Sequence, residues 1–317
     1  MTTPAFGPLT PYITPTILQS APTGISWNTI PSGSQVSPEA KASEIYNICQ
    51  RATSMAEGYT NQVLRASLNT EFVQGPDYYS TLQPSTGNVR VILSRWPIMN
   101  IEAVSVSPNT FPRTFTSLPT GYWAAEQPVI GVYGSTAAGG SAQGGQAVII
   151  SGQAGGGWAL GRNGFVIQVQ YVSGWPHTSL TAACNSGDGT LQVDDCTGWA
   201  VTNDIGETGA RGTIYDPGGN QEQVTVASAS VTSGPGTLTL VSPMLYAHAQ
   251  NTLYTTMPAT IQWACALYSA SIALTRGATA TSIHTIPGGG AGTPALRGPE
   301  SLLEEAELLL HSYMRVI

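Results

Sequence analysis

The chain has 317 residues, a net charge of −7 and only 9% charged residues, with 36 glycines and 22 prolines. This length allows one large domain or two modest ones, and the neutral polar composition predicts many turns and much β structure. A single lysine accompanies ten arginines, which argues against a basic patch that would hold phosphate backbones tightly. No glycine-rich loop precedes Lys41, so a P-loop nucleotide site is excluded.

The sequence has no apolar segment after a basic start and no run of 18 apolar residues. These features predict neither a signal peptide nor a membrane span. We therefore expect a protein that is made and used in a cytoplasm and has no membrane partner.

The spacing of the four cysteines does not predict a disulfide framework. Cys49 and Cys265 lie on apolar faces of expected helices, where a free cysteine packs as a small hydrophobic residue. Cys184 and Cys196 flank a β-like run and could meet across a hairpin. Without CxxC spacing or a nearby histidine, two free thiols are favoured over a pair. We expect no metal site and no cofactor.

Residues 1–36 are proline-rich and predict an extended arm with one brief helix, which Thr14 caps and Pro15 begins. Ser37 then caps a long helix. Gly58 is a weak point at which this helix could bend or break. The apolar residues that recur at helical spacing and should face the core are Ile45, Ile48, Cys49, Ala52, Met55, Tyr59 and Val63.

Residues 70–106 predict strands, in the stretches TEFVQ and GNVRVIL and within SRWPIMNIEAVSVS. Residues 95–97 form a stiff corner, at which Arg95 is expected to pack on Trp96 or to pair with a carboxylate. The alternative for Arg95 is a ligand contact. Residues 107–128 and 131–157 are expected to be surface loops, because the glycine runs match neither GxGxxG nor GxSxG.

A strand is expected at residues 165–172, where every second side chain should face a core. Gly174 and Pro176 should end it. From 178 to 255 the chain shows five or six short β-like runs separated by turn clusters, which predicts a small inserted barrel or sandwich. The core-facing residues of the strand are Phe165, Ile167, Val169 and Tyr171.

The acidic residues of the insert are expected in turns for backbone reasons, with a metal site or a glycosidase pair as the alternatives. The histidines show no metal-ligand spacing, and no serine or cysteine near one has a recognisable nucleophile context. We therefore expect no catalysis. The acids are Asp188, Asp194, Asp195, Asp204, Asp216 and Glu222, and the histidines are His177, His248, His284 and His311.

An apolar helix is expected at 258–275, followed by a tether rich in Gly, Thr and Pro and then by a terminal amphipathic helix. This last helix either folds back on the core or binds in the groove of a partner. The long tether favours the partner. The expected apolar face contains Leu303, Ala306, Leu310, Tyr313 and Ile317.

Five stretches together resemble the head-to-tail adaptor, or connector, proteins of tailed bacteriophages. They are CQRATSMAEGYTNQVLRA, RWPI, GRNGFVIQVQYVSGWPH, ALYSASIALTRG and ESLLEEAELLLHSYMRVI. The resemblance covers roughly residues 10–177 and 256–317 and rests on order and pattern. It implies a structural virion protein that forms a dodecameric homo-oligomer ring under the portal. The ring would join the portal to a head-closure or tail protein in the phage neck, be assembled in the host cytoplasm, and let duplex DNA pass without tight binding.

The interpretation is therefore an α+β protein with a helical, connector-like core, a small β element, an inserted all-β barrel or sandwich domain and a tethered C-terminal helix. The predicted divisions are 1–177 (first part of the core), 178–255 (insert) and 256–317 (core helix, tether and portal-docking helix). The portal-docking candidates that the resemblance implies are Leu302, Leu303, Ala306, Leu310, Tyr313 and Arg315.

Two alternatives use the inserted domain. One is a carbohydrate-active or peptide-cleaving enzyme, whose carboxylates should converge in a pocket, whereas those of an adaptor should be scattered on turns. The other is a glycan-binding module, for which exposed Trp199, Tyr215 and Tyr246 would have to form a platform.

Overall fold

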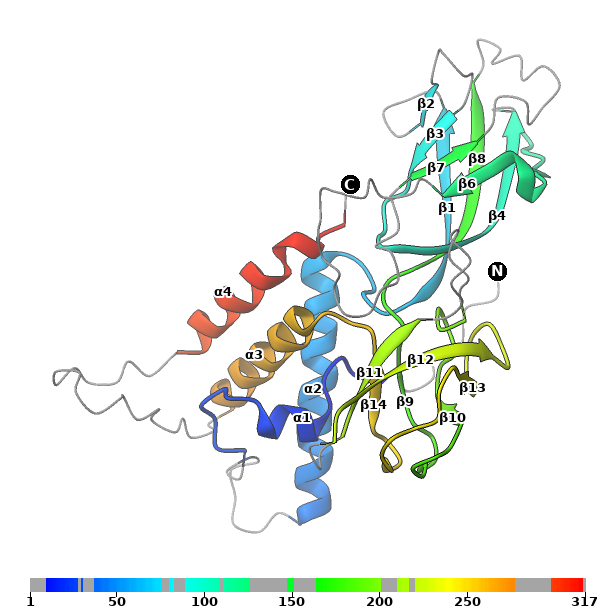
Figure 1. The fold of residues 1–317 in the computed structure, drawn as a ribbon. Helices are drawn as coiled ribbons and strands as arrows, with labels where there is room; N and C mark the ends of the chain where they lie inside the picture. Colours follow the sequence, from blue (N-terminus) through cyan, green and yellow to red (C-terminus); the bar gives the residue numbers. More distant parts are fainter. Residues whose placement is uncertain are drawn as a thin grey trace, which may run out of the picture. The chain divides into compact units, whose positions relative to one another are not determined.

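The computed structural model describes residues 10–27, 30, 37–75, 80–82, 89–108, 111–125, 147–150, 164–200, 210–216, 220–276 and 298–315. Helices and antiparallel strands occur in separate parts of the chain, so the fold is α+β as predicted (Figure 1). The chain forms two compact units. A helical unit comprises Met1–Gln62, Pro217–Gly219 and Met257–Met314, and a β unit comprises Val63–Asp216, Asn220–Thr256 and Arg315–Ile317.

The helical unit contains α1 (Pro15–Ser20), α2 (Pro38–Thr60), α3 (Ala259–Thr275) and α4 (Pro299–Leu310), which continues as the short 3-10 helix η3 (His311–Tyr313). Both predicted N-caps are confirmed. The Thr14 hydroxyl accepts from the Ile17 amide at 3.4 Å, and the Ser37 hydroxyl accepts from the Ala40 amide at 3.2 Å. These side chains satisfy amides that have no partner within the first turn of a helix.

The segment before α1 packs on α2. Tyr12 is fully buried, its amide donates to Thr53 Oγ1 at 3.0 Å, and its hydroxyl donates to Glu57 Oε1 at 2.5 Å. The described part of the predicted arm is therefore a packed part of the helical unit.

The buried stripe of α2 agrees with the prediction in its first half and departs from it in the second. Ile45, Ile48, Cys49 and Ala52 are buried, but Ala56 takes the next buried position while Met55 remains 37% exposed. Steps of four residues from Ala52 keep the stripe on one side of a straight helix. The helix runs through Gly58 and ends at Thr60 without a break.

Helix α3 lies between α2 and α4 and contacts both (Figure 1). It is buried on nearly all sides, as expected for a helix that is apolar all round. Its many small residues allow close approach of the neighbouring helices. The buried side chains of α3 include Ala264, Cys265, Ala266, Leu267, Tyr268, Ser269, Ala270 and Ala273.

Two four-stranded antiparallel sheets share one core in the β unit. The first has the order β1 (Ser67–Gly75), β8 (Phe165–Ser173), β4 (Ile98–Pro108), β5 (Thr116–Ser117). The second has the order β2 (Ser80–Leu82), β3 (Val89–Ile92), β7 (Ala147–Ile150), β6 (Trp123–Ala125). Val91 and Ile150 of the second sheet join Val73 and Val104 of the first in one hydrophobic cluster.

The alternation predicted for β8 is confirmed, because Phe165, Ile167, Val169 and Tyr171 all lie in this core. Two expectations need correction. The β part is not a small element. Residues 107–128, expected to be a loop, include the end of β4, β5, a short 3-10 helix η2 (Thr120–Tyr122) and β6, and the expected loop 131–157 contains β7. The remainder of 131–157 lies outside the described residues.

The predicted turn after β8 depends on Gly174. Its φ is +101°, and its amide donates to the Pro97 carbonyl at 2.9 Å. A Cβ added here would lie only 2.3 Å from the Arg65 carbonyl oxygen, so any other residue would both clash and be strained.

The third sheet is formed by residues 177–255. Its order is β10 (Thr190–Val193), β13 (Gly236–Leu240), β12 (Glu222–Ala229), β11 (Arg211–Tyr215), β14 (Leu253–Thr255), β9 (His177–Ser179). An isolated bridge between Leu180 and Val193 joins the two edges, so the sheet curls toward closure like a small barrel. The five predicted β-like runs are confirmed as β10 to β14, and the sheet has a hydrophobic cluster of its own.

Candidate functional site

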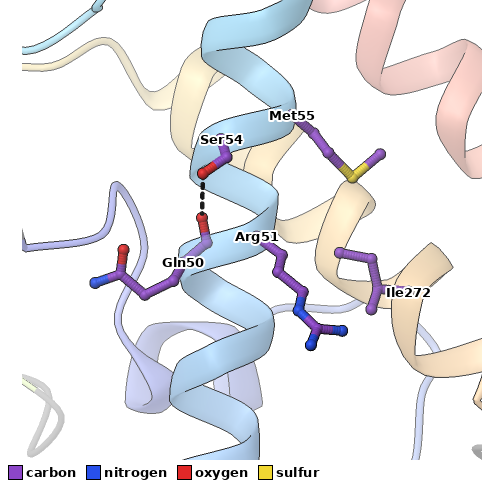
Figure 2. A pocket seen from close by; sticks show the side chains of 5 residues that line it. All are labelled: Gln50, Arg51, Ser54, Met55 and Ile272. Atoms are coloured by element: carbon purple, nitrogen blue, oxygen red, sulfur yellow. Dashed lines mark hydrogen bonds between the residues drawn. The ribbon is translucent and has the colours of Figure 1, made fainter.

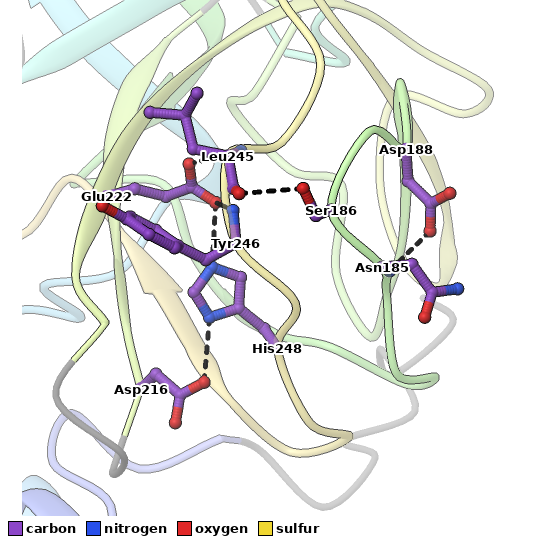
Figure 3. A network of polar contacts seen from close by, with 8 residues as sticks. All are labelled: Asn185, Ser186, Asp188, Asp216, Glu222, Leu245, Tyr246 and His248. Atoms are coloured by element: carbon purple, nitrogen blue, oxygen red, sulfur yellow. Dashed lines mark hydrogen bonds and ion pairs between the residues drawn. The ribbon is translucent and has the colours of Figure 1, made fainter.

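A buried polar network in the six-stranded sheet joins Asp216, Glu222 and His248 (Figure 3). His248 Nδ1 lies 3.0 Å from Asp216 Oδ2, and its Nε2 lies 2.9 Å from Glu222 Oε1. Asp216 follows β11, Glu222 begins β12, and His248 lies in the segment before β14. The histidine ring is completely buried.

The network also holds the chain between β13 and β14. The Glu222 carboxylate accepts from the Leu245 amide at 2.9 Å and from the Tyr246 amide at 3.4 Å (Figure 3). The Ser186 hydroxyl donates to the Leu245 carbonyl at 2.9 Å. Both oxygens of Glu222 therefore have protein partners, and this carboxylate holds the backbone at Leu245 and Tyr246 in place.

Both ring nitrogens of His248 have a carboxylate oxygen within hydrogen-bonding distance, so each side of the buried imidazole has a polar partner. Sequence reasoning missed this network, because its members are separated by 26 and 32 residues and form no spacing motif.

The other described acids of the insert agree with the turn interpretation. Asp188 accepts from the Asn185 amide at 2.7 Å, and Asp194 accepts from the Ser179 amide at 2.8 Å. Asp195 accepts from the amides of Thr197 and Gly234 at 2.9 and 3.1 Å. Among the residues that the structure describes, no group of three or more His, Cys, Asp or Glu is placed to hold a metal ion. Asp204 and His284 lie outside these residues.

All four cysteines are buried and free. Burial raises the pKa of the Cys49 thiol to about 12. Burial and then the nearby Asp195 carboxylate raise the pKa of Cys196 to about 11. Both effects disfavour the thiolate, so these thiols are poor nucleophiles.

His177 and Arg95 have structural partners. His177 is buried, with its Nδ1 2.9 Å from Thr255 Oγ1, where β9 pairs with β14. Arg95 Nη1 donates to the side-chain amide oxygen Oδ1 of Asn69 at 2.6 Å. His311 is exposed at the end of α4.

The aromatic platform that the glycan-binding alternative requires is not formed, because Trp199 is not exposed. Trp199 has 0% exposure and stacks on Tyr254 with ring centroids 3.9 Å apart. A Cβ added at Gly212 would lie 2.8 Å from the Trp199 ring, so the strand backbone closes over the tryptophan. Trp199 is a core residue because its indole fills the inside of the curled sheet.

Helix α4, the predicted docking element, lies folded back on α3. Leu302, Ala306 and Leu310 are buried at a spacing of four residues. Leu303 was expected on this apolar face but is only half-buried, whereas Leu302 takes the buried position. Of the two alternatives for this helix, the structure therefore has the folded-back one.

Hydrogen bonds fix both ends of α4 within the helical unit. The Ser271 hydroxyl of α3 donates to the Pro299 carbonyl at 2.9 Å, and Gln62 Nε2 donates to the Tyr313 carbonyl at 2.7 Å. Within the β unit, Arg315 Nε donates to Ser94 Oγ at 2.9 Å. Tyr313 and Arg315 are half-buried.

A shallow, open depression lies where α2 faces α3 (Figure 2). Ser54 donates to the Gln50 carbonyl at 3.2 Å at its rim. The depression has one charged side chain and no converging acid, base or nucleophile. Its lining residues are Gln50, Arg51, Ser54, Met55 and Ile272.

No protein-family model, curated protein or solved structure matches this chain. In the described part of the chain, none of the helices is both long and apolar enough to cross a membrane.

Proposed function

We propose that this chain is a structural virion protein. Its copies form a ring in the neck of a tailed bacteriophage, where the ring joins the portal to the next head-closure or tail protein and surrounds the DNA channel. The dodecameric number and the neighbours come from the resemblance described above. The protein acts by assembly and not by catalysis.

The observation that carries the proposal is the order of the elements. The five stretches that resemble adaptor proteins correspond to α2, the corner before β4, β8, α3 and α4. The inserted sheet interrupts this order between β8 and α3, where residues 177 and 255 face each other on paired strands. The resemblance implies a helical core with a β element, and the inserted sheet departs from the shortest members of that family.

The charge balance supports a channel through which DNA slides. Eleven basic residues stand against 18 acidic ones, so the ring has too few cations to hold phosphates along its whole lumen. Most described acids of the insert are occupied by backbone amides in turns, which favours an architectural role for them.

Docking of α4 to the portal would be an exchange of partners. Leu302, Ala306 and Leu310 are covered by α3 in the free chain, so they reach a portal groove only if α4 leaves α3. Leu303, Tyr313 and Arg315 are half-buried and complete the proposed docking set. A ring would present many such helices together, which strengthens weak single contacts.

Electron microscopy and sedimentation velocity of the purified full-length protein, alone and with portal rings, test this proposal. A ring of twelve 33.0 kDa copies would have a mass of about 400 kDa. Rings that co-sediment with the portal are expected, and deletion of residues 299–317 should leave the rings but abolish portal binding. A chain that forms no ring, even with the portal present, would refute the proposal.

A further inference from the structure

Strand β1 lies at the end of its sheet and exposes large apolar side chains. Among the described strands it pairs only with β8. Leu68 is 62% exposed and Phe72 is 56% exposed. The alternate side chains face inward, because Glu71 accepts from the Tyr171 hydroxyl at 2.7 Å and Val73 lies in the core. Leu68, Thr70 and Phe72 therefore share the outer face.

This outer face is nearly free of charge. Paired residues across the sheet point to the same side, and the rows that begin at Leu68, Thr70 and Phe72 continue with Val172, Gln170 and Gln168 on β8. On β4 the rows continue with Asn100, Ala103 and Ser105, and Ser105 pairs with Ser117 on β5. The ring of Phe72 lies 5.6 Å from that of Phe115, centroid to centroid. Glu102, in a bulge of β4, accepts from the Asn100 side chain at 2.8 Å. Depletion of charge around exposed aliphatic and aromatic side chains is typical of the centre of a protein interface.

The sequence of β1 is complementary to itself. If two copies pair antiparallel about a two-fold axis at Thr70, Leu68 of each copy lies opposite Phe72 of the other, and Asn69 lies opposite Glu71. An axis one residue later would place Glu71 against Glu71 and remove both apolar pairs. Charge and apolar matching thus select one register.

We infer that β1 is a homodimer contact, in which the β1 edges of two copies pair antiparallel with Thr70 opposite Thr70. The contact joins the two four-stranded sheets into one continuous sheet and covers Leu68 and Phe72 on both copies. It is isologous, whereas a closed ring of many copies uses two different surfaces of each chain. The inference therefore does not depend on the proposed ring.

Matched lysine substitutions test the contact in the full-length protein. Thr70→Lys places two ammonium groups at the axis, as edge lysines do in natural sheets. Gln170→Lys adds the same charge in the same row, one strand away from the edge. We expect a concentration-dependent dimer in sedimentation equilibrium, at least tenfold weaker for Thr70→Lys and unchanged for Gln170→Lys. Equal weakening by both variants, or a wild-type chain that does not self-associate, would overturn the inference.

Single cysteines test the register and separate the dimer from the ring. Opposed residues of an antiparallel pair have Cα atoms about 4.5 to 5.5 Å apart, within the range that a disulfide spans. Thr70→Cys should therefore form a disulfide-linked dimer on a denaturing gel, with or without rings. Gln170 is also exposed but lies a strand from the axis, so Gln170→Cys should remain unlinked. Rings without the Thr70→Cys dimer would refute this contact and leave the proposed function intact.

Discussion

At the scale of single residues, His248 is the side chain that links two carboxylates inside the six-stranded sheet. It separates two carboxylates, and one of these, Glu222, holds the backbone at Leu245 and Tyr246. Removing one partner from a buried charged group leaves the other uncompensated, which costs more than the intact pair contributes. The network is therefore a point of high sensitivity in the curled sheet.

His248→Ala should destabilise the protein by about 3 kcal/mol, because Asp216 and Glu222 then lose their shared partner. Chemical denaturation monitored by tryptophan fluorescence measures this, since Trp199 is buried in the same sheet. His311→Ala is the matched control and should leave stability unchanged, because His311 is exposed. Equal stability of the two variants would show that the network contributes little.

At the scale of elements, the stability of helix α4 depends on its packing against α3. A helix of 12 residues is marginal in isolation, and one face of three buried side chains supplies most of its stabilisation here. The small residues of α3 let the two helices approach closely. Because only three side chains of α4 are buried in this contact, the helix can exchange it for another apolar surface.

Leu310→Asp should release α4, because a carboxylate replaces a side chain that has no exposure. The expected loss of packing is about 2 to 3 kcal/mol, the value of burying one leucine. Hydrogen exchange across residues 299–313 should become faster. Leu308→Asp, at a leucine of the same helix that is 77% exposed, should leave the exchange unchanged. Similar hydrogen-exchange protection of α4 in both variants would contradict the role of Leu310 in holding α4 on α3.

At the scale of the whole molecule, the six-stranded sheet is an inserted body within the β unit. It has its own hydrophobic cluster, and the chain enters and leaves it on the paired strands β9 and β14. It also packs closely on the rest of the unit, because a Cβ added at Gly198 would lie 2.9 Å from Ala66 Cβ. Independent folding of residues 178–255 stays a prediction.

Replacing residues 178–255 with a short Gly-Ser link should leave a folded remainder, because residues 177 and 255 already face each other. Circular dichroism should retain the helical signal and a cooperative thermal transition. The midpoint should fall by several degrees, since Ala66 and Pro176 lose the contact with Gly198. An unfolded product would show that the sheet is part of the core of the β unit.

Features that depend on neighbouring residues were predictable. The caps at Thr14 and Ser37, the alternation in β8 and the five short strands of the insert follow from spacings of two to four residues. The turn at Gly174 belongs to the same class, because a φ of +101° is a conformation that glycine adopts far more readily than other residues. Each of these sequence patterns involves neighbouring residues only, so its prediction does not depend on where the element packs.

Other features depend on which distant segments meet. Strand β7 has only four residues and takes its place between β3 and β6, and Trp199 is buried because Tyr254 and Gly212 enclose it. His248 meets carboxylates 26 and 32 residues away, and α4 returns to α3 rather than remaining apart. Such contacts are chosen by the packing of complementary surfaces, and a spacing pattern along the chain does not contain that information.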